Sequence, residues 1–123
     1  MGHQLVLHLY QTTKKAPREL RYTLVQKLLS EAVEALVDID SANRIYEAAE
    51  RLGHLRSLQR RMLRIGVLMT AAFEQRCLGH GAMAVCIATL DDMEHQALKW
   101  AIQTENRVDS TGAVKAEHLS DVR

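Results

Sequence analysis

Arginine side chains recur at a regular spacing in the middle of the sequence. Arg56, Arg60 and Arg64 stand four residues apart, and Arg61 lies beside them. Residues four apart lie on one face of a helix, where like charges repel one another slightly. A row of phosphates would relieve that repulsion, so the spacing predicts contacts with the backbone of a nucleic acid. The alternative is a solvated face whose arginines pair with acids from a neighbouring helix.

A second group of cations surrounds the single proline of the chain, Pro17. The segment 14–64 holds eleven Lys or Arg and seven Asp or Glu, or +4, whereas the remainder holds five and eight, or −3. This asymmetry predicts a basic surface on one side of the molecule, although the formal net charge is +1. Few aromatic residues are present to stack on bases, so we expect contacts to the backbone and sensitivity to salt. The candidate nucleic-acid contacts are Lys14, Lys15, Arg18, Arg21, Arg56, Arg60, Arg61 and Arg64.

One short motif could belong to a metal site. The pair Cys77 and His80, with Cys86 and His95 further along, resembles half of a zinc site. A second pair at ligand spacing is missing, and Cys86 falls among apolar residues, where buried structural thiols are common. We therefore expect no metal and no cofactor. A metal-dependent enzyme acting through Cys77 and His80 is kept as a third hypothesis, after a nucleic-acid-binding protein and a structural or protein–protein bundle.

Motifs for other catalytic chemistry are missing from the sequence. It contains no glycine-rich phosphate loop, no Gly-x-Ser-x-Gly elbow and no His-Glu-x-x-His pair. The sequence therefore predicts a protein that is not an enzyme.

The composition predicts one all-α domain. The 123 residues suffice for one domain, and a core of Leu, Ala, Ile, Val and Met with one Phe and one Trp suits helices better than sheets. Two cysteines are too few for a disulfide scaffold, and the first residues lack the pattern of a signal peptide. No window approaches the 18 or so apolar residues of a membrane span. We therefore expect a cytoplasmic protein without a membrane partner.

The basic row lies within a long amphipathic segment, 44–76. Its apolar residues recur every three or four positions without a proline, which predicts one helix of about 50 Å. Such a helix needs partners of similar length, so residues 1–106 should form an up-and-down four-helix bundle. Gly53 and Gly66 could mark a bend or a close helix contact, or could simply be tolerated. The expected helices are 3–13, 17–38, 44–76 and 82–106, with a connection at 37–43 and a flexible C-terminal tail at 107–123.

Several apolar residues fall outside the main stripes of these helices. One bundle buries one face per helix, so a second apolar strip predicts packing between subunits. The alternative is a scatter of exposed apolar residues, which is normal on protein surfaces. The residues concerned are Tyr10, Tyr22, Val33, Val37, Leu63, Leu68 and Trp100.

An ordered set of local patterns covers about four fifths of the chain. The patterns are Leu9-Tyr10, the Lys-x-x-Pro-Arg step at 14–18, Arg21-Tyr22-Thr23-Leu24, Leu52-x-x-Leu55-Arg56-x-Leu58, and Trp100 flanked by Leu98 and Ile102. Together with the segments 13–43 and 90–103, this set resembles the accessory variability determinant (Avd) proteins of diversity-generating retroelements. That family belongs to a wider group of four-helix bundles, which includes proteins encoded by intervening sequences in 23S ribosomal RNA genes.

The resemblance implies a four-helix protomer that assembles into a pentameric barrel. It also implies a basic surface that binds RNA or DNA, a reverse transcriptase partner, and a non-catalytic role in mutagenic retrohoming. The segment 37–43 lacks the proline and the Asn-Ile-Ala-Glu-Gly run of the ribosomal relatives, which favours the retroelement branch. The alternative is a structural or protein–protein bundle of the ribosomal intervening-sequence type, without a nucleic-acid role. The positions carried over are Lys14, Lys15, Arg18, Arg21, Arg56, Arg60 and Arg64.

Overall fold

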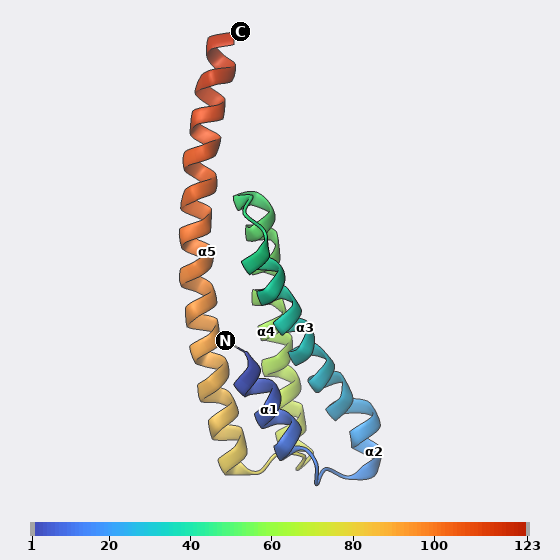
Figure 1. Ribbon diagram of the computed structural model, residues 1–123. Coiled ribbons are helices and arrows are strands. Elements are labelled where there is room, and N and C mark those ends of the chain that lie inside the picture. Colours follow the sequence, from blue (N-terminus) through green and yellow to red (C-terminus); the bar gives the residue numbers. More distant parts are fainter. Residues whose placement is uncertain (1, 123) are drawn as a thin grey trace.

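The computed structural model describes the backbone of residues 2–122 and the side chains of residues 2–109. All regular structure in the described chain is helical (Figure 1). The elements are α1 (His3–Thr12), α2 (Arg18–Leu20), the π-helical turn η1 (Arg21–Val25), α3 (Gln26–Arg44), α4 (Ala48–Glu74) and α5 (His80–Val122). Because α2, η1 and α3 follow one another without a break, the described chain forms four rods. The predicted all-α four-helix fold is confirmed at this level.

The rods pack as an up-and-down bundle in which α1 is much shorter than its neighbours. Helix α4 packs against α3 and α5, and α1 packs against both α3 and α5, so α1 lies diagonally across from α4. At 1.5 Å per residue, α1 is about 15 Å long and α4 about 40 Å. Figure 1 shows α1 beside the lower part of α5, near the α4–α5 connection. Four helices therefore surround the core at that end, and three surround it at the other.

The core of the bundle follows the predicted apolar stripes. On α4, Leu55, Leu58, Met62, Ile65 and Met69 are buried at spacings of three and four. The other helices contribute matching stripes to the same cluster. The large side chains among them are Leu5 and Leu9 of α1, Leu28 of α3, and Cys86, Leu90 and Met93 of α5.

The connection between the second and third rods differs from the prediction. It was expected at 37–43, but α3 continues to Arg44 and the turn occupies Ile45–Glu47. The carboxylate of Glu47 caps α4 by accepting hydrogen bonds from the backbone N–H groups of Ala49 (3.1 Å) and Glu50 (2.7 Å). The capping residues in 37–43 predicted the wrong turn because Ile39 and Ala42 are buried and keep α3 helical there.

The last helix also extends further than predicted. Helix α5 continues past Asn106, where the sequence analysis ended it, to Val122. Thr104 is buried and Val108 packs against the core, so the inner stripe of α5 continues beyond the predicted end. Most of the predicted flexible tail, 107–123, lies outside the residues whose side chains are described, and its flexibility stays a prediction.

The apolar surplus divides into exposed and packed residues. Trp100 and Leu68 pack against the core, which corrects their predicted place outside it. Gly2, at the start of α1, lies against Met93, and Trp100 lies two turns further along α5. The guanidinium of Arg51 lies 6.0 Å from the Trp100 ring centroid and covers the indole. The residues that are exposed, as the prediction of subunit packing requires, are Tyr10, Tyr22, Val33, Val37 and Leu63.

Gly53 lies on the outer face of α4 with open space around it. A Cβ atom added there meets no atom of another helix within 4 Å, so the glycine does not mark a close helix contact in the described chain. We expect Gly53→Ala to raise the free energy of unfolding by about 0.5–1 kcal/mol, because glycine is the weaker helix former. Urea denaturation followed by circular dichroism would measure this. A destabilised variant would indicate that another subunit packs closely against this face.

Candidate nucleic-acid interface

Three arginines form a row on the outer face of α4. Arg56, Arg60 and Arg64 are all exposed, as their spacing predicted. The row, called the α4 stripe below, spans about 12 Å from its first to its last Cα atom. A nucleic-acid duplex presents about seven phosphate charges over that length. The stripe is therefore long enough to contact several phosphates at once.

The charges of the α4 stripe are largely free. Arg56 Nη2 lies 3.7 Å from Glu105 Oε1, but both side chains are more than half exposed. An ion pair of that kind contributes about 0–1 kcal/mol, and a phosphate could displace it. Among the side chains that the structure describes, no carboxylate lies within ion-pair distance of Arg60 or Arg64. The stripe thus presents a basic surface and not a set of closed ion pairs.

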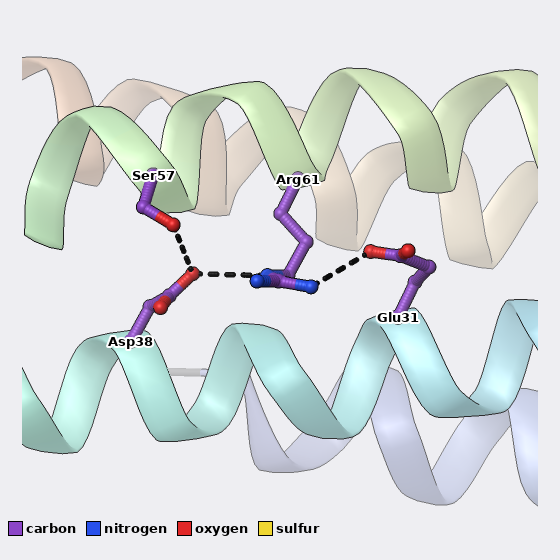
Figure 2. A network of polar contacts seen from close by, with 4 residues as sticks. All are labelled: Glu31, Asp38, Ser57 and Arg61. Carbon is purple, nitrogen blue, oxygen red and sulfur yellow. Dashed lines mark hydrogen bonds and ion pairs between the residues drawn. The ribbon is translucent and has the colours of Figure 1, made fainter.

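Arg61 does not belong to this surface, which corrects its prediction as a nucleic-acid contact. Its guanidinium lies between α4 and α3 (Figure 2), with Nε 3.0 Å from Asp38 Oδ2 and Nη1 3.0 Å from Glu31 Oε2. The hydroxyl of Ser57 donates to the same Asp38 oxygen at 3.2 Å. The side chains of Arg61, Glu31 and Asp38 are 22%, 16% and 12% exposed. Arg61 therefore joins two helices and is not available to a phosphate.

The charge of Arg61 is fixed by this arrangement. Burial by itself lowers the pKa of Arg61, but the hydrogen bonds and charges of Asp38 and Glu31 outweigh burial and raise the pKa above its ordinary value. One cation thus faces two carboxylates in a largely buried site. Removing the cation would leave both carboxylates without their partner.

A residue that the sequence analysis left out of the site lies beside the α4 stripe. Lys27 of α3 and Arg64 line an open cavity of about 380 Å³ between α3 and α4. Leu63 and Val67, 68% and 70% exposed, supply apolar surface to the same cavity. Leu68 and Glu31, whose carboxylate pairs with Arg61, complete the lining. Two cations beside exposed apolar side chains could also suit a protein partner.

The second predicted group lies at the turn between α1 and α3. Lys14, Lys15, Arg18 and Arg21 are all exposed. Arg21 also holds the turn together, because its guanidinium donates from Nε to the carbonyl of Ala16 at 2.9 Å and from Nη2 to the carbonyl of Lys14. These contacts with carbonyl oxygens fix the guanidinium without neutralising it. This group comes from α2, η1 and the turn before them, whereas the α4 stripe belongs to one helix.

The Cys77-x-x-His80 pair, which resembles half of a zinc site, has no further ligands gathered around it among the described residues. Cys77 and Cys86 are buried free thiols, and burial raises the pKa of both. His80 is exposed and stands edge-on to Phe73, with 5.0 Å between ring centroids. Among the described residues, no group of three or more His, Cys, Asp or Glu is placed to hold a metal ion. These thiols belong to the core, and their raised pKa keeps them protonated near neutral pH.

Comparisons with known proteins do not extend this description. Searches against protein-family models, curated proteins and solved structures find no significant match to the chain. None of the helices described in residues 2–122 combines the length and the apolar character needed to cross a bilayer. The interface is therefore interpreted from its own geometry and charge.

Proposed function

We propose that this protein is a non-catalytic nucleic-acid-binding accessory protein that partners a reverse transcriptase in a diversity-generating retroelement. The observation that carries the nucleic-acid part is the exposed α4 stripe, in which Arg60 and Arg64 have no carboxylate partner among the described side chains. The reverse transcriptase partner and the retroelement rest on the sequence resemblance. A reverse transcriptase gene beside near-identical repeats in the genome would support that part.

The proposal includes assembly into a homo-oligomer, a pentameric barrel by the same resemblance. The +4 charge of the segment 14–64 would sum to about +20 around a ring of five copies. Such a ring would bind polyanions more strongly than one weakly charged protomer. Its exposed apolar residues, such as Val33 and Val37, provide surface for contacts between subunits.

Binding to nucleic acids of several kinds tests the proposal directly. Fluorescence polarisation would compare RNA, DNA and hybrid duplexes of one sequence over 50 to 200 mM salt. Three phosphate contacts release about 2.7 counterions from a duplex, so affinity should fall about 40-fold over that range. Binding that is weaker than millimolar at 50 mM salt, or that does not change with salt, would contradict the proposal.

A protein–protein role is the second candidate function, and one observation favours it. Leu63 and Val67 lie exposed in the same cavity as Lys27 and Arg64, and phosphates make no use of their apolar surface. An acidic amphipathic helix would use both the cations and the apolar side chains. This alternative predicts that no nucleic acid binds, and that the substitution Leu63→Ser disrupts a complex with another protein.

A further inference from the structure

Two of the chain's three tyrosines stand exposed among the cations that precede α3. Tyr10, in α1, is 60% exposed, and Tyr22, in the π-helical turn η1, is 71% exposed. Between residues 10 and 25 the chain carries four basic residues and one acid, Glu19. An exposed aromatic ring beside cations is the arrangement that proteins use to bind unpaired nucleotides.

A cavity of about 240 Å³ lies beside Tyr10, between α1 and the start of α3, and is called the α1–α3 corner below. Val25 and Leu29 supply its apolar part, and Tyr10 stands beside them. Lys14 and Arg21 supply its positive charge. This is about the volume that eight water molecules occupy in the liquid, so one planar base fits in the cavity against the tyrosine. Apolar surface, an aromatic ring and two cations therefore converge on one cavity.

The cation of Arg21 is held in place at this cavity. Its Nε and Nη2 atoms donate to the carbonyl oxygens of Ala16 and Lys14, so the guanidinium closes the turn between α1 and α2. No carboxylate among the described side chains pairs with it. A phosphate that reaches the corner therefore meets a positive charge that is already positioned.

The backbone at the corner is also unusual. Residues Arg21–Val25 form a π-helical turn, in which the N–H of Gln26 donates to the carbonyl of Arg21, five residues back. Such turns are rare and are found often at functional sites, because they displace side chains from regular helical positions. Here the turn carries both Arg21 and Tyr22.

We infer that the α1–α3 corner binds unpaired nucleotides of an RNA or DNA strand. A base stacks on Tyr10, and the neighbouring phosphates contact Lys14 and Arg21. Tyr22, which follows Arg21 in η1 but does not line the cavity, offers a second stacking surface. A duplex cannot use this corner in the same way, because its bases already stack on one another. The inference rests on the proposed function and adds a preference for single strands, whereas the α4 stripe contacts phosphates without that preference.

Three tyrosine substitutions of the full chain test this inference. The probes are a labelled unstructured single strand and a duplex of equal length, and the variants are Tyr10→Leu and Tyr22→Leu. Each variant should weaken single-strand binding about 5- to 100-fold and leave duplex binding within about twofold. Tyr46→Leu is the matched control, because Tyr46 is 86% exposed at the α3–α4 turn, at the other end of the bundle (Figure 1).

A conservative variant separates stacking from other roles of the ring. Tyr10→Phe keeps the aromatic face and should bind the single strand as the wild type does. The inference is wrong if Tyr10→Phe loses as much as Tyr10→Leu, or if Tyr46→Leu has the same effect. It is also wrong if Tyr10→Leu changes the oligomeric state and not the single-strand affinity, because the corner would then be a subunit contact.

If the wild type binds duplex and single strands but the tyrosine variants lose nothing, the inference fails alone. If the wild type binds neither, the proposed function fails as well.

Discussion

Reversing the charges of the α4 stripe in the variant R56E/R60E/R64E should lower duplex affinity about 10²- to 10³-fold near 0.1 M salt. Each lost phosphate contact removes the release of about 0.9 counterion, and the three introduced carboxylates repel the phosphates. Fluorescence polarisation with one duplex at fixed salt would measure the loss. The proposal assigns this binding to Arg56, Arg60 and Arg64, so an unchanged affinity would exclude the stripe as the site.

The same variant should remain as stable as the wild type, to within about 1 kcal/mol. All three side chains are exposed, and the ion pair of Arg56 with Glu105 is a weak surface pair. Like charges four apart are present both before and after the change, so the repulsion along α4 is similar. Thermal melting followed by circular dichroism would detect an unfolded variant before any loss of binding is interpreted.

A charge-matched control separates the stripe from the total charge. R44E/K99E/R107E also reverses three exposed cations, so both triple variants change the net charge by the same amount. These three residues lie on α3 and α5 and not on α4. We expect the control to lower duplex affinity by less than about tenfold. An equal loss in both variants would indicate that binding follows the overall charge of the molecule.

Replacing Arg61 by methionine should lower the free energy of unfolding by about 3 kcal/mol. The substitution leaves the largely buried carboxylates of Asp38 and Glu31 without the cation that both contact at 3.0 Å. Because these carboxylates are 12–16% exposed, the effect should lie at the low end of the range for buried pairs. Urea denaturation would measure it, with Arg60→Met as the control, since Arg60 is exposed on the same helix.

A variant without any charge in this network tests whether the ion pairs themselves contribute to stability. In E31M/D38L/R61M, apolar side chains replace all three charged groups. Stability should then return to within about 1 kcal/mol of the wild type, because ion pairs of this kind contribute little net free energy. A triple variant that is as unstable as Arg61→Met would show that the network contributes more than the mutual neutralisation of its charges.

Arg61→Met under folding conditions should keep duplex affinity within about twofold.

The fold could be predicted from the periodicity of apolar residues, and the outward direction of the α4 stripe followed from the same pattern. The charge of Arg61 and its position beside Arg60 do not predict the direction of its side chain, since one step along a helix turns a side chain by about 100°. A signal was nevertheless present. Arg61 stands three residues after Leu58 and four before Ile65, which are both fully buried. A cation at that phase of the helix lies at the edge of the core and needs a partner.

The partner of Arg61 carried a similar signal. Asp38 stands three residues after Ala35 and four before Ala42, both of which are buried, so it falls on the inner side of α3. The capping residues in 37–43 instead predict that the helix ends near Asp38 and that the turn lies there. Local capping preferences and burial compete at such positions, and a single sequence does not give the packing that decides between them.

The remaining differences depend on how the helices are placed relative to one another. Lys27 joins the site because α3 and α4 pack in a register that sets it beside Arg64. Trp100 packs against the core at a level of α5 two turns beyond Met93, against which Gly2 lies at the start of α1. Neither the register nor the reach of α1 can be read from the periodicity of one helix. The exposed basic face of α4 was therefore predictable from the sequence, but the residues that lie beside it were not.

The salt dependence of duplex binding tests the central claim most directly. The logarithm of the association constant would be measured against the logarithm of salt concentration for the wild type and for R56Q/R60Q/R64Q. If the α4 stripe makes three phosphate contacts, the slope of the variant should be less steep by about 2.7. Equal slopes for the two proteins would contradict the claim that Arg56, Arg60 and Arg64 contact phosphates.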